Sequence, residues 1–174
     1  MADAPEAGLN GDASGSQNGS QDAIQGAEPM VHAHAQYIKD FSFENPDALD
    51  SIDESGDAPE VSFNCAVESR KLSDATHEVV LKFEGKAMRG EKALFLVALD
   101  YAGLFTFDNV PPEHEDGVIN VHCPTMLFPF ARNIIANVTR DGGYPQLLID
   151  IIDFNAMYAA SLAENTGQPE NTET

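Results

Sequence analysis

The chain has 174 residues with 29 acidic and 9 basic side chains, giving a formal net charge of −20 at pH 7. This charge argues against nucleic acid as a partner, because binding to phosphates requires lysine and arginine clusters that are absent here. A basic protein partner is favoured instead, although an acidic surface can also serve solubility alone.

The two ends of the chain are polar. Residues 1–35 contain no aromatic side chain, lysine or arginine and are rich in alanine, glycine, serine and glutamine. Such a segment cannot bury enough apolar surface to offset chain entropy, so we expect a disordered acidic tail. The end of the chain, residues 164–174 with the sequence ENTGQPENTET, is expected to be a second disordered tail. The folded domain is therefore predicted to span residues 36–163.

Alternating polar and apolar residues predict four strands. They span residues 36–44, 61 to about 68, 77 to about 88, and about 92 to 101. Because successive side chains of a strand point to opposite faces, the first strand pairs an apolar face with Phe41 and Phe43 and an acidic face with Asp40 and Glu44. Short connections favour an antiparallel meander with one covered and one solvated face.

A different pattern follows the fourth strand. Residues 102–122 contain a Pro-Pro pair and several turn formers, which predict a long crossover loop. A helix is expected from about Phe128 to Arg140, with Pro129 in its first turn. A second helix should begin near Asp153, a plausible N-cap. The fold class is therefore α+β, a four-stranded antiparallel sheet with two C-terminal helices on one face.

No motif for enzyme chemistry stands out. A Gly-rich phosphate loop is missing, and no cofactor or metal is expected. His122 and Cys123 are adjacent, but neighbours in an extended segment point apart, so Cys123 is interpreted as a small buried residue. A thiol enzyme centred on Cys123 remains the alternative from another class. His32 and His34 fall in the predicted tail, and His77 and His114 are expected on the surface.

Four blocks of sequence carry a family resemblance: YIKDFSFENP, EKALFLVALDYAGLF, HCPTMLFPFARNIIANVTRDGGYPQL and DFNAMYAASL. In this order, from Tyr37 to Leu162, they resemble SecB, the bacterial protein-export chaperone, and Cys123–Leu147 is the most specific part. The resemblance implies a homotetramer, a dimer of dimers, that binds unfolded preproteins without ATP and delivers them to the SecA translocation ATPase. A SecB-like chaperone dedicated to one client, such as an antitoxin, is the alternative.

The resemblance also implies functional residues. SecA would meet the solvated sheet face through Asp40, Glu44 and Leu96, while the family's fourth docking residue, an acid, falls on Ala98. Asp100, two residues on with the same facing, is the candidate to compensate. Similar proteins bind preproteins in a groove between the crossover loop, the second helix and the sheet, which here suggests Val61, Phe63, Phe105, Phe107, Phe154, Met157 and Tyr158. Val97, Leu99 and Tyr101, opposite Leu96, are expected to influence subunit association.

The expected location is the cytoplasm. The first residues lack the positively charged and apolar regions of a secretory signal. The longest apolar run, Ala93–Leu99, is far too short to span a bilayer, so no direct membrane insertion is expected. A reducing compartment would keep the two cysteines, Cys65 and Cys123, as thiols.

Overall fold

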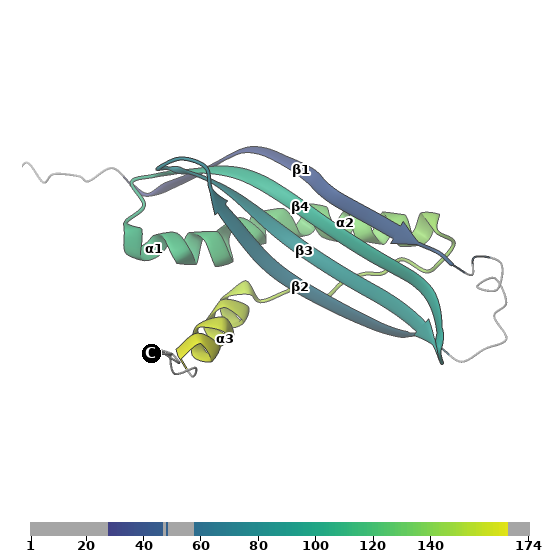
Figure 1. Ribbon diagram of the computed structural model, residues 1–174. Helices are drawn as coiled ribbons and strands as arrows, with labels where there is room; N and C mark the ends of the chain where they lie inside the picture. The colour runs from purple at the N-terminus through teal and green to yellow at the C-terminus, as the bar shows by residue number, and fades with distance from the viewer. Residues whose placement is uncertain (1–27, 47, 49–57, 167–174) are drawn as a thin grey trace, which may run out of the picture.

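The computed structural model describes residues 28–46, 48 and 58–166. Four antiparallel strands form one sheet in the order β1-β4-β3-β2, and the helices lie on one of its faces (Figure 1). The predicted α+β class is confirmed. The meander holds only for β2, β3 and β4, because β1 pairs with β4 instead of with β2.

The elements follow in this order: β1 (Met30–Glu44), β2 (Glu60–Lys71), β3 (Thr76–Arg89), β4 (Lys92–Asp108), α1 (Pro112–Gly117), the π-helical segment η2 (Val118–His122), α2 (Cys123–Asp141) and α3 (Phe154–Thr166).

Both predicted tails include residues that belong to regular structure. Strand β1 starts at Met30, so residues 30–35 belong to the sheet, where Met30 lies opposite Asp108 on β4. Pairing with a long neighbouring strand satisfies the backbone of this segment although it is rich in alanine and histidine. At the other end, α3 continues to Thr166. Residues 1–27 and 167–174 of the predicted tails lie outside the described residues.

The expected crossover loop is mostly regular structure. Strand β4 continues to Asp108, and its alternation buries Phe105 and Phe107. The Pro-Pro pair does not interrupt a loop but starts α1, where a proline in the first turn leaves no helical hydrogen bond unmade. From there α1, η2 and α2 follow one another without a break. Pro129 consequently lies inside α2 and not in its first turn.

The hydrophobic core lies between the sheet and α2. Alternate residues of β3 and β4, including Phe83 and Leu99, are almost completely buried against helix residues such as Leu127 and Ile135. We call this side of the sheet the inner face, and the side without helices the outer face (Figure 1). The N-cap predicted for the last helix is confirmed, because Asp153 Oδ1 accepts a hydrogen bond of 3.0 Å from the amide of Ala156.

A small polar cluster ties the end of β1 to the turn after α2. The Tyr144 hydroxyl lies 2.7 Å from Asn45 Oδ1 and 2.8 Å from the carbonyl oxygen of Leu94, so these two acceptors share its proton. Asn45 also donates a hydrogen bond of 2.9 Å to the Gly142 carbonyl. A Cβ atom at Gly142 would lie 2.6 Å from the Phe43 ring, so a larger residue there would displace that ring. The cluster fixes the strand end that carries Glu44.

Candidate functional site

The outer face brings the predicted docking residues together. Directly paired residues of antiparallel strands share a face, and β1 and β4 pair Asp40 with Asp100, Ser42 with Ala98, and Glu44 with Leu96. Phe43 points the other way and stacks on Phe95, with ring centroids 5.8 Å apart. The alternation predicted from the sequence therefore places Asp40, Glu44 and Leu96 on one helix-free surface.

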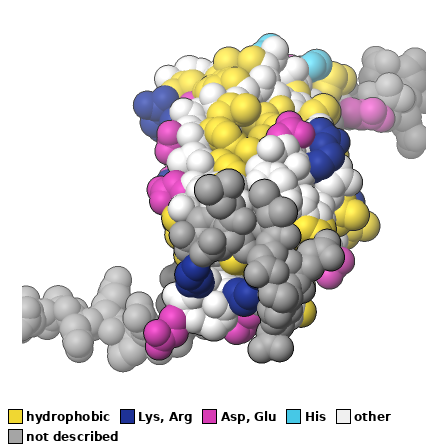
Figure 2. Space-filling model, turned by 90° about the vertical axis from the view of Figure 1, so that its right-hand side faces the viewer, with side chains coloured by type: hydrophobic (Ala, Val, Ile, Leu, Met, Phe, Trp, Pro, Cys, Tyr) yellow, Lys and Arg dark blue, Asp and Glu magenta, His cyan; other side chains and the backbone are white. Residues whose placement is uncertain are grey.

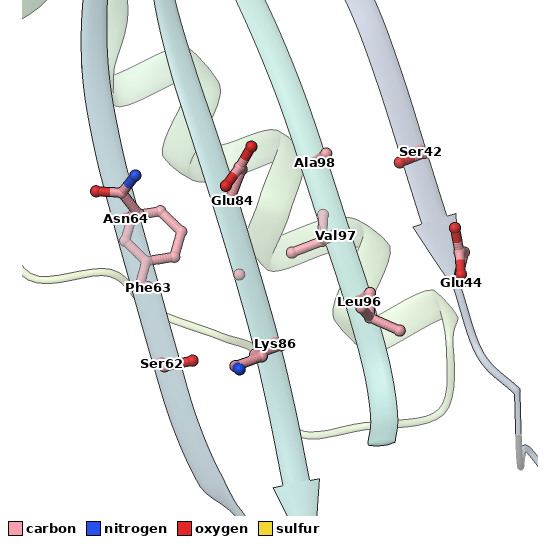
Figure 3. Close-up of a pocket in the computed structure, with 11 residues that line it drawn as sticks. Ser42, Glu44, Ser62, Phe63, Asn64, Glu84, Lys86, Leu96, Val97 and Ala98 are labelled. Carbon is pink, nitrogen blue, oxygen red and sulfur yellow. The ribbon is translucent and has the colours of Figure 1, made fainter. Parts of the chain in front are cut away.

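A shallow depression of about 470 Å³ lies on this outer face (Figure 3). Two rows of outer-face residues line it, and each row runs across β1, β4, β3 and β2 with one residue from each strand. The first row is Glu44, Leu96, Lys86 and Ser62, and the second is Ser42, Ala98, Glu84 and Asn64. Small side chains at Ser42 and Ala98 leave the hollow open beside Leu96. Two of the three predicted docking residues thus border a concave surface.

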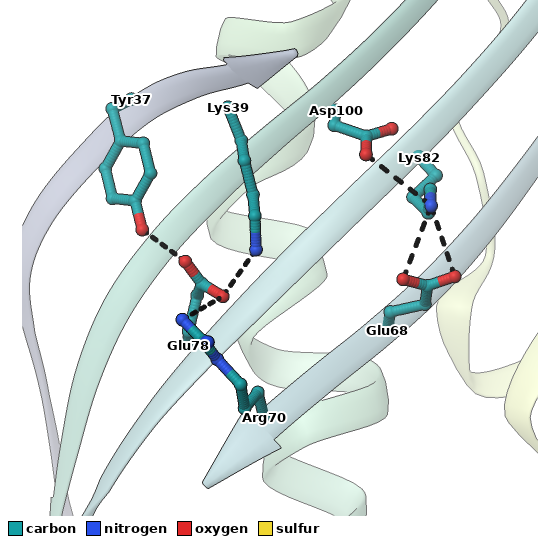
Figure 4. Close-up of polar contacts among 7 residues, drawn as sticks. All are labelled: Tyr37, Lys39, Glu68, Arg70, Glu78, Lys82 and Asp100. Atoms are coloured by element: carbon teal, nitrogen blue, oxygen red, sulfur yellow. Dashed lines mark hydrogen bonds and ion pairs between the residues drawn. The ribbon is translucent and has the colours of Figure 1, made fainter. Parts of the chain in front are cut away.

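Further along the outer face, Glu78 is buried in a polar network (Figure 4). Tyr37 donates a hydrogen bond to its carboxylate, Lys39 Nζ lies 2.7 Å away and Arg70 lies 3.3 Å away. The hydrogen bond from Lys39, followed by that from Tyr37, holds the pKa of Glu78 below its ordinary value. A carboxylate that is so fully paired holds the strands together and is not available to a partner.

Lys82 neutralises a second group of acids on this face (Figure 4). Its ammonium lies 3.3 Å from Glu68 and 3.5 Å from Asp100. Asp100 does share the facing of Ala98, as the sequence predicted, but its charge is engaged within the chain. In the part of the chain that the structure describes, Asp40, Glu44 and Glu84 make no such pair. Their carboxylates remain available to a partner.

The residues predicted to bind preproteins fall into two groups. Phe105, Phe107 and Phe154 are buried in the core. Met157 and Tyr158 of α3 are half-buried and line a depression of about 220 Å³ beside Cys65 and Val67 of β2. Phe63 and Val61 lie on the same side of β2, Val61 being exposed. Tyr158 also lines a wider depression of about 630 Å³, bounded by Met30, Val118 and Val121.

Val97, Leu99 and Tyr101 are already buried within one chain. Strand β4 is an interior strand and not an edge strand, so these three residues need no second subunit to cover them. The exposed apolar residues nearby belong to β1 and to the solvent-exposed side of α2. Their exposed fractions are 50% for Ile38, 38% for Phe41 and 52% for Phe130. Phe130 stacks on Tyr101. Exposed hydrophobic side chains also gather in the end view of Figure 2.

The cysteines are not placed for chemistry. Cys123 is fully buried, and burial raises its pKa to about 12, as it also does for Cys65. Burial thus disfavours a thiolate nucleophile at either position near neutral pH. His122 and Cys123 lie in a helical segment and not in the extended one expected from the sequence. Within the described residues, no group of histidine, cysteine, aspartate and glutamate side chains could hold a metal ion.

Three histidines lie elsewhere than predicted. His32 and His34 are in β1, where His32 lies 3.2 Å from Asp108 and His34 lies 2.8 Å from the Thr106 hydroxyl. His77 is buried and stacks on Phe107, with ring centroids 4.8 Å apart, and burial lowers its pKa. His114 is exposed, as expected.

None of the described helices is long and apolar enough to cross a membrane.

Comparisons with known proteins point to one family. The family of the preprotein translocase subunit SecB matches residues 24–165. The protein-export protein SecB of Afipia carboxidovorans is 40% identical over 146 residues, covering 84% of this chain and 91% of that protein. Its counterpart from Beijerinckia indica is 44% identical over 147 residues, covering 84% and 91%. That from Agrobacterium fabrum is 43% identical over 154 residues, covering 88% and 94%.

A solved structure has the same fold. A SecB-like chaperone of Mycobacterium tuberculosis, in complex with an antitoxin peptide, superposes with a TM-score of 0.54 and 13% sequence identity. The match covers 70% of this chain and 90% of that one. At this identity the likeness concerns the fold alone.

Proposed function

The chain belongs to the SecB family of protein-export chaperones, which are not enzymes, and we propose from this premise that it binds unfolded preproteins in the cytoplasm and delivers them to the SecA translocation ATPase. Binding and release would need no ATP. The two sides of the sheet would divide the work, with the partner ATPase on the outer face and preproteins on the side of α3.

The observation that supports docking most directly is the register of β1 on β4. It aligns Asp40 and Glu44 with Leu96 on the face that none of the described helices covers. Charges arranged in this way steer a basic partner to the surface and fix its orientation, whereas the exposed leucine adds apolar contact. Asp40 and Glu44 are about 13 Å apart along an extended strand, at about 3.3 Å per residue, so they act as a strip and not as a catalytic pair.

Preproteins would bind beside α3. Tyr158 borders both depressions on that side, which together join β2, η2 and the start of β1. Among the described strands, β2 forms an edge of the sheet, and an extended client can add main-chain hydrogen bonds to such an edge. Apolar side chains with little demand on client sequence suit a chaperone that accepts many preproteins.

Assembly into a homotetramer, a dimer of dimers, is part of the same proposal. Strand β1 is an edge strand with 15 residues, and Ile38 and Phe41 are exposed along it. Long apolar edges invite pairing unless another chain covers them. Together with Phe130 on α2, they are better candidates for contacts between subunits than the buried residues of β4.

Dedication to a single client is the second candidate. The solved SecB-like chaperone holds an antitoxin peptide, but it shares only 13% identity with this chain, against 40–44% for the export proteins. A pull-down from cytosol decides between them. Many precursor proteins would support export, and one antitoxin as sole client would support dedication.

Purified protein provides the basic test. Added to a denatured precursor without nucleotide, it should slow aggregation and folding, and it should leave the folded form unaffected. Native mass measured with and without this precursor should give a tetramer and a tetramer–client complex. A requirement for ATP would contradict the proposal.

A further inference from the structure

His77 is a buried histidine that takes no part in the proposed docking or client binding. It lies at the start of β3 on the inner face, and only 4% of its surface is exposed. Its ring stacks on the Phe107 ring, with 14° between the planes and 4.8 Å between the centroids. Its Nε2 atom has no hydrogen-bond partner among the described residues. Buried polar atoms are rarely left unsatisfied in this way, so the position calls for an explanation.

The end of the sheet that carries His77 is the end beneath which α1 lies (Figure 1). Val110 and Val118, which flank α1, pack against the same hydrophobic core as Phe107. The helix itself is short, with six residues, and none of them is buried. From α1, the half-buried Glu115 is close enough to act on the charge of His77. The surroundings of the imidazole therefore depend on whether α1 is packed against the sheet.

The packed structure favours the neutral imidazole. Burial lowers the pKa of His77 below its ordinary value of 6.5; Glu115 opposes this effect, and Lys71, directly paired with His77 on β2, adds to it. In the protonated ring both nitrogens are donors, and Nε2 finds no acceptor here. The neighbours on β3 and β4 carry no charge on this face: Val79, Phe105 and Phe107.

We propose that His77 is an acid-sensitive latch for α1: the neutral ring lets α1 pack against the sheet, and protonation releases the helix so that the ring can reach water. The release is local, because a short helix with no buried residue opens at a lower free energy than the core strands. Val118 and Val121, which follow α1, line the depression of about 630 Å³, so the release changes the shape of that depression. The latch is a property of the fold and does not rest on the proposed function.

The direction of the pH effect follows from the linkage between protonation and opening. A histidine whose folded pKa lies below 6.5 binds its proton more tightly once it is released. Opening is therefore unaffected by this group well above pH 6.5 and becomes more favourable as the pH falls from 6.5 through the folded pKa. A single proton can raise the opening constant by at most about tenfold between pH 7.5 and pH 5.5.

Amide hydrogen exchange of the full-length protein at these two pH values, corrected for the intrinsic effect of pH on exchange, measures the opening. In wild type, protection of residues 112–122 should fall by up to about tenfold on acidification, whereas protection at the centre of β4 should not. His77→Phe keeps a ring on Phe107 but cannot be protonated, so the acid response of α1 should disappear. His114→Gln removes a histidine of α1 itself and is the control that should respond like wild type.

Two further variants test the charges around the latch, which a merely structural role of His77 would not involve. Lys71→Gln should move the acid response to higher pH, and Glu115→Gln should move it to lower pH. An equal acid response in wild type and His77→Phe would overturn the inference, as would an equal loss of protection in α1 and at the centre of β4. If His77→Phe does not fold, the charge variants decide, and a response at the same pH in both contradicts the latch.

Discussion

The two faces of this sheet are built from the same four strands and differ in the kinds of side chain that each can accommodate. On the inner face, Phe83 and Leu99 are buried against α2, where volume and apolarity decide which side chains fit. On the outer face, their neighbours along β3 and β4 are polar or small, namely Lys82, Glu84, Ala98 and Asp100, and the carboxylate of Glu84 makes no ion pair among the described residues. One face thus holds the fold together, while the other can change its charges without loss of packing.

Glu78 is an exception among the charged residues of the outer face. It lies on the outer face, yet it is buried and paired with Lys39 and Arg70. The outer face therefore has two groups of charges: those around Glu78 and Lys82, which are satisfied within the chain, and Asp40, Glu44 and Glu84, which make no ion pair among the described residues. Only the second group is suited to a partner, because its charges are not already neutralised.

The sharpest way to break the comparison is to place the same charge on both faces of β4. Leu99→Asp buries an unpaired carboxylate in the core and should cost about 4 kcal/mol or more of unfolding free energy, enough to unfold the domain. Leu96→Asp, three residues earlier on the exposed face, should change stability by only about 0.5 kcal/mol. Urea unfolding at one fixed protein concentration measures both. Equal losses would mean that the faces are not distinct.

Glu78→Gln tests the exception, with an expected loss of about 2 kcal/mol at pH 7 from the charged hydrogen bonds that Lys39 and Tyr37 donate. Because the folded pKa of Glu78 lies below its ordinary value of 4.5, its contribution is complete above that pH and is lost as the pH falls through the folded value. The stability gap between wild type and Glu78→Gln should therefore narrow below pH 4.5. A gap that is constant with pH contradicts the ion pairing.

Tyr144→Phe should have a smaller effect, about 1 kcal/mol, because it removes the hydroxyl that links the turn after α2 to Asn45 and Leu94. Tyr158→Phe is the matched control, since the hydroxyl of Tyr158 has no partner in the described residues. Thermal unfolding compares the two. A loss in Tyr158→Phe as large as that in Tyr144→Phe would mean that the hydrogen bonds of Tyr144 contribute nothing specific.

The smallest expected effect is an increase in affinity for SecA. Lys86 borders the same hollow as Glu84 but carries the opposite charge, so Lys86→Gln should strengthen docking of a basic partner about twofold and leave the stability unchanged. Calorimetry with SecA at low salt gives the measurement. Weaker binding in Lys86→Gln would show that the partner presents an acid at this point.

The sequence was sufficient for the facing of each strand, because alternation is a local property that needs no knowledge of the neighbouring strand. Asp40, Ser42 and Glu44 could be assigned to one side from spacing alone. What lay beside them could not, since β1 pairs with β4, and neither the strand order nor the pairing of Glu84 with Ala98 follows from local pattern. The family resemblance implied a missing acid at position 98, but only the register shows which side chains lie beside Ala98.

The lengths of β1 and β4 and the start of α1 also could not be predicted from the sequence. Residues 30–35, with the sequence MVHAHA, contain few of the β-branched and aromatic residues typical of strands, and they form one because β4 is long enough to pair with them. The prolines before α1 indicated a loop, although a proline is equally compatible with the first turn of a helix. Strand β1, with fifteen residues, therefore begins before its predicted start at residue 36, and β4, with seventeen residues, continues past its predicted end at residue 101. Tertiary pairing decided where these strands began and ended.

The most direct test of the division between the two sides is Asp40→Lys/Glu44→Lys, measured in two assays. Both residues are exposed on the outer face, so charge reversal should leave the core and α3 intact. Calorimetry with SecA should show affinity reduced at least about tenfold, or about 1.4 kcal/mol, and less dependent on salt. Suppression of precursor aggregation should equal that of wild type. Undiminished affinity for SecA, or loss of aggregation suppression in the folded variant, would contradict the division.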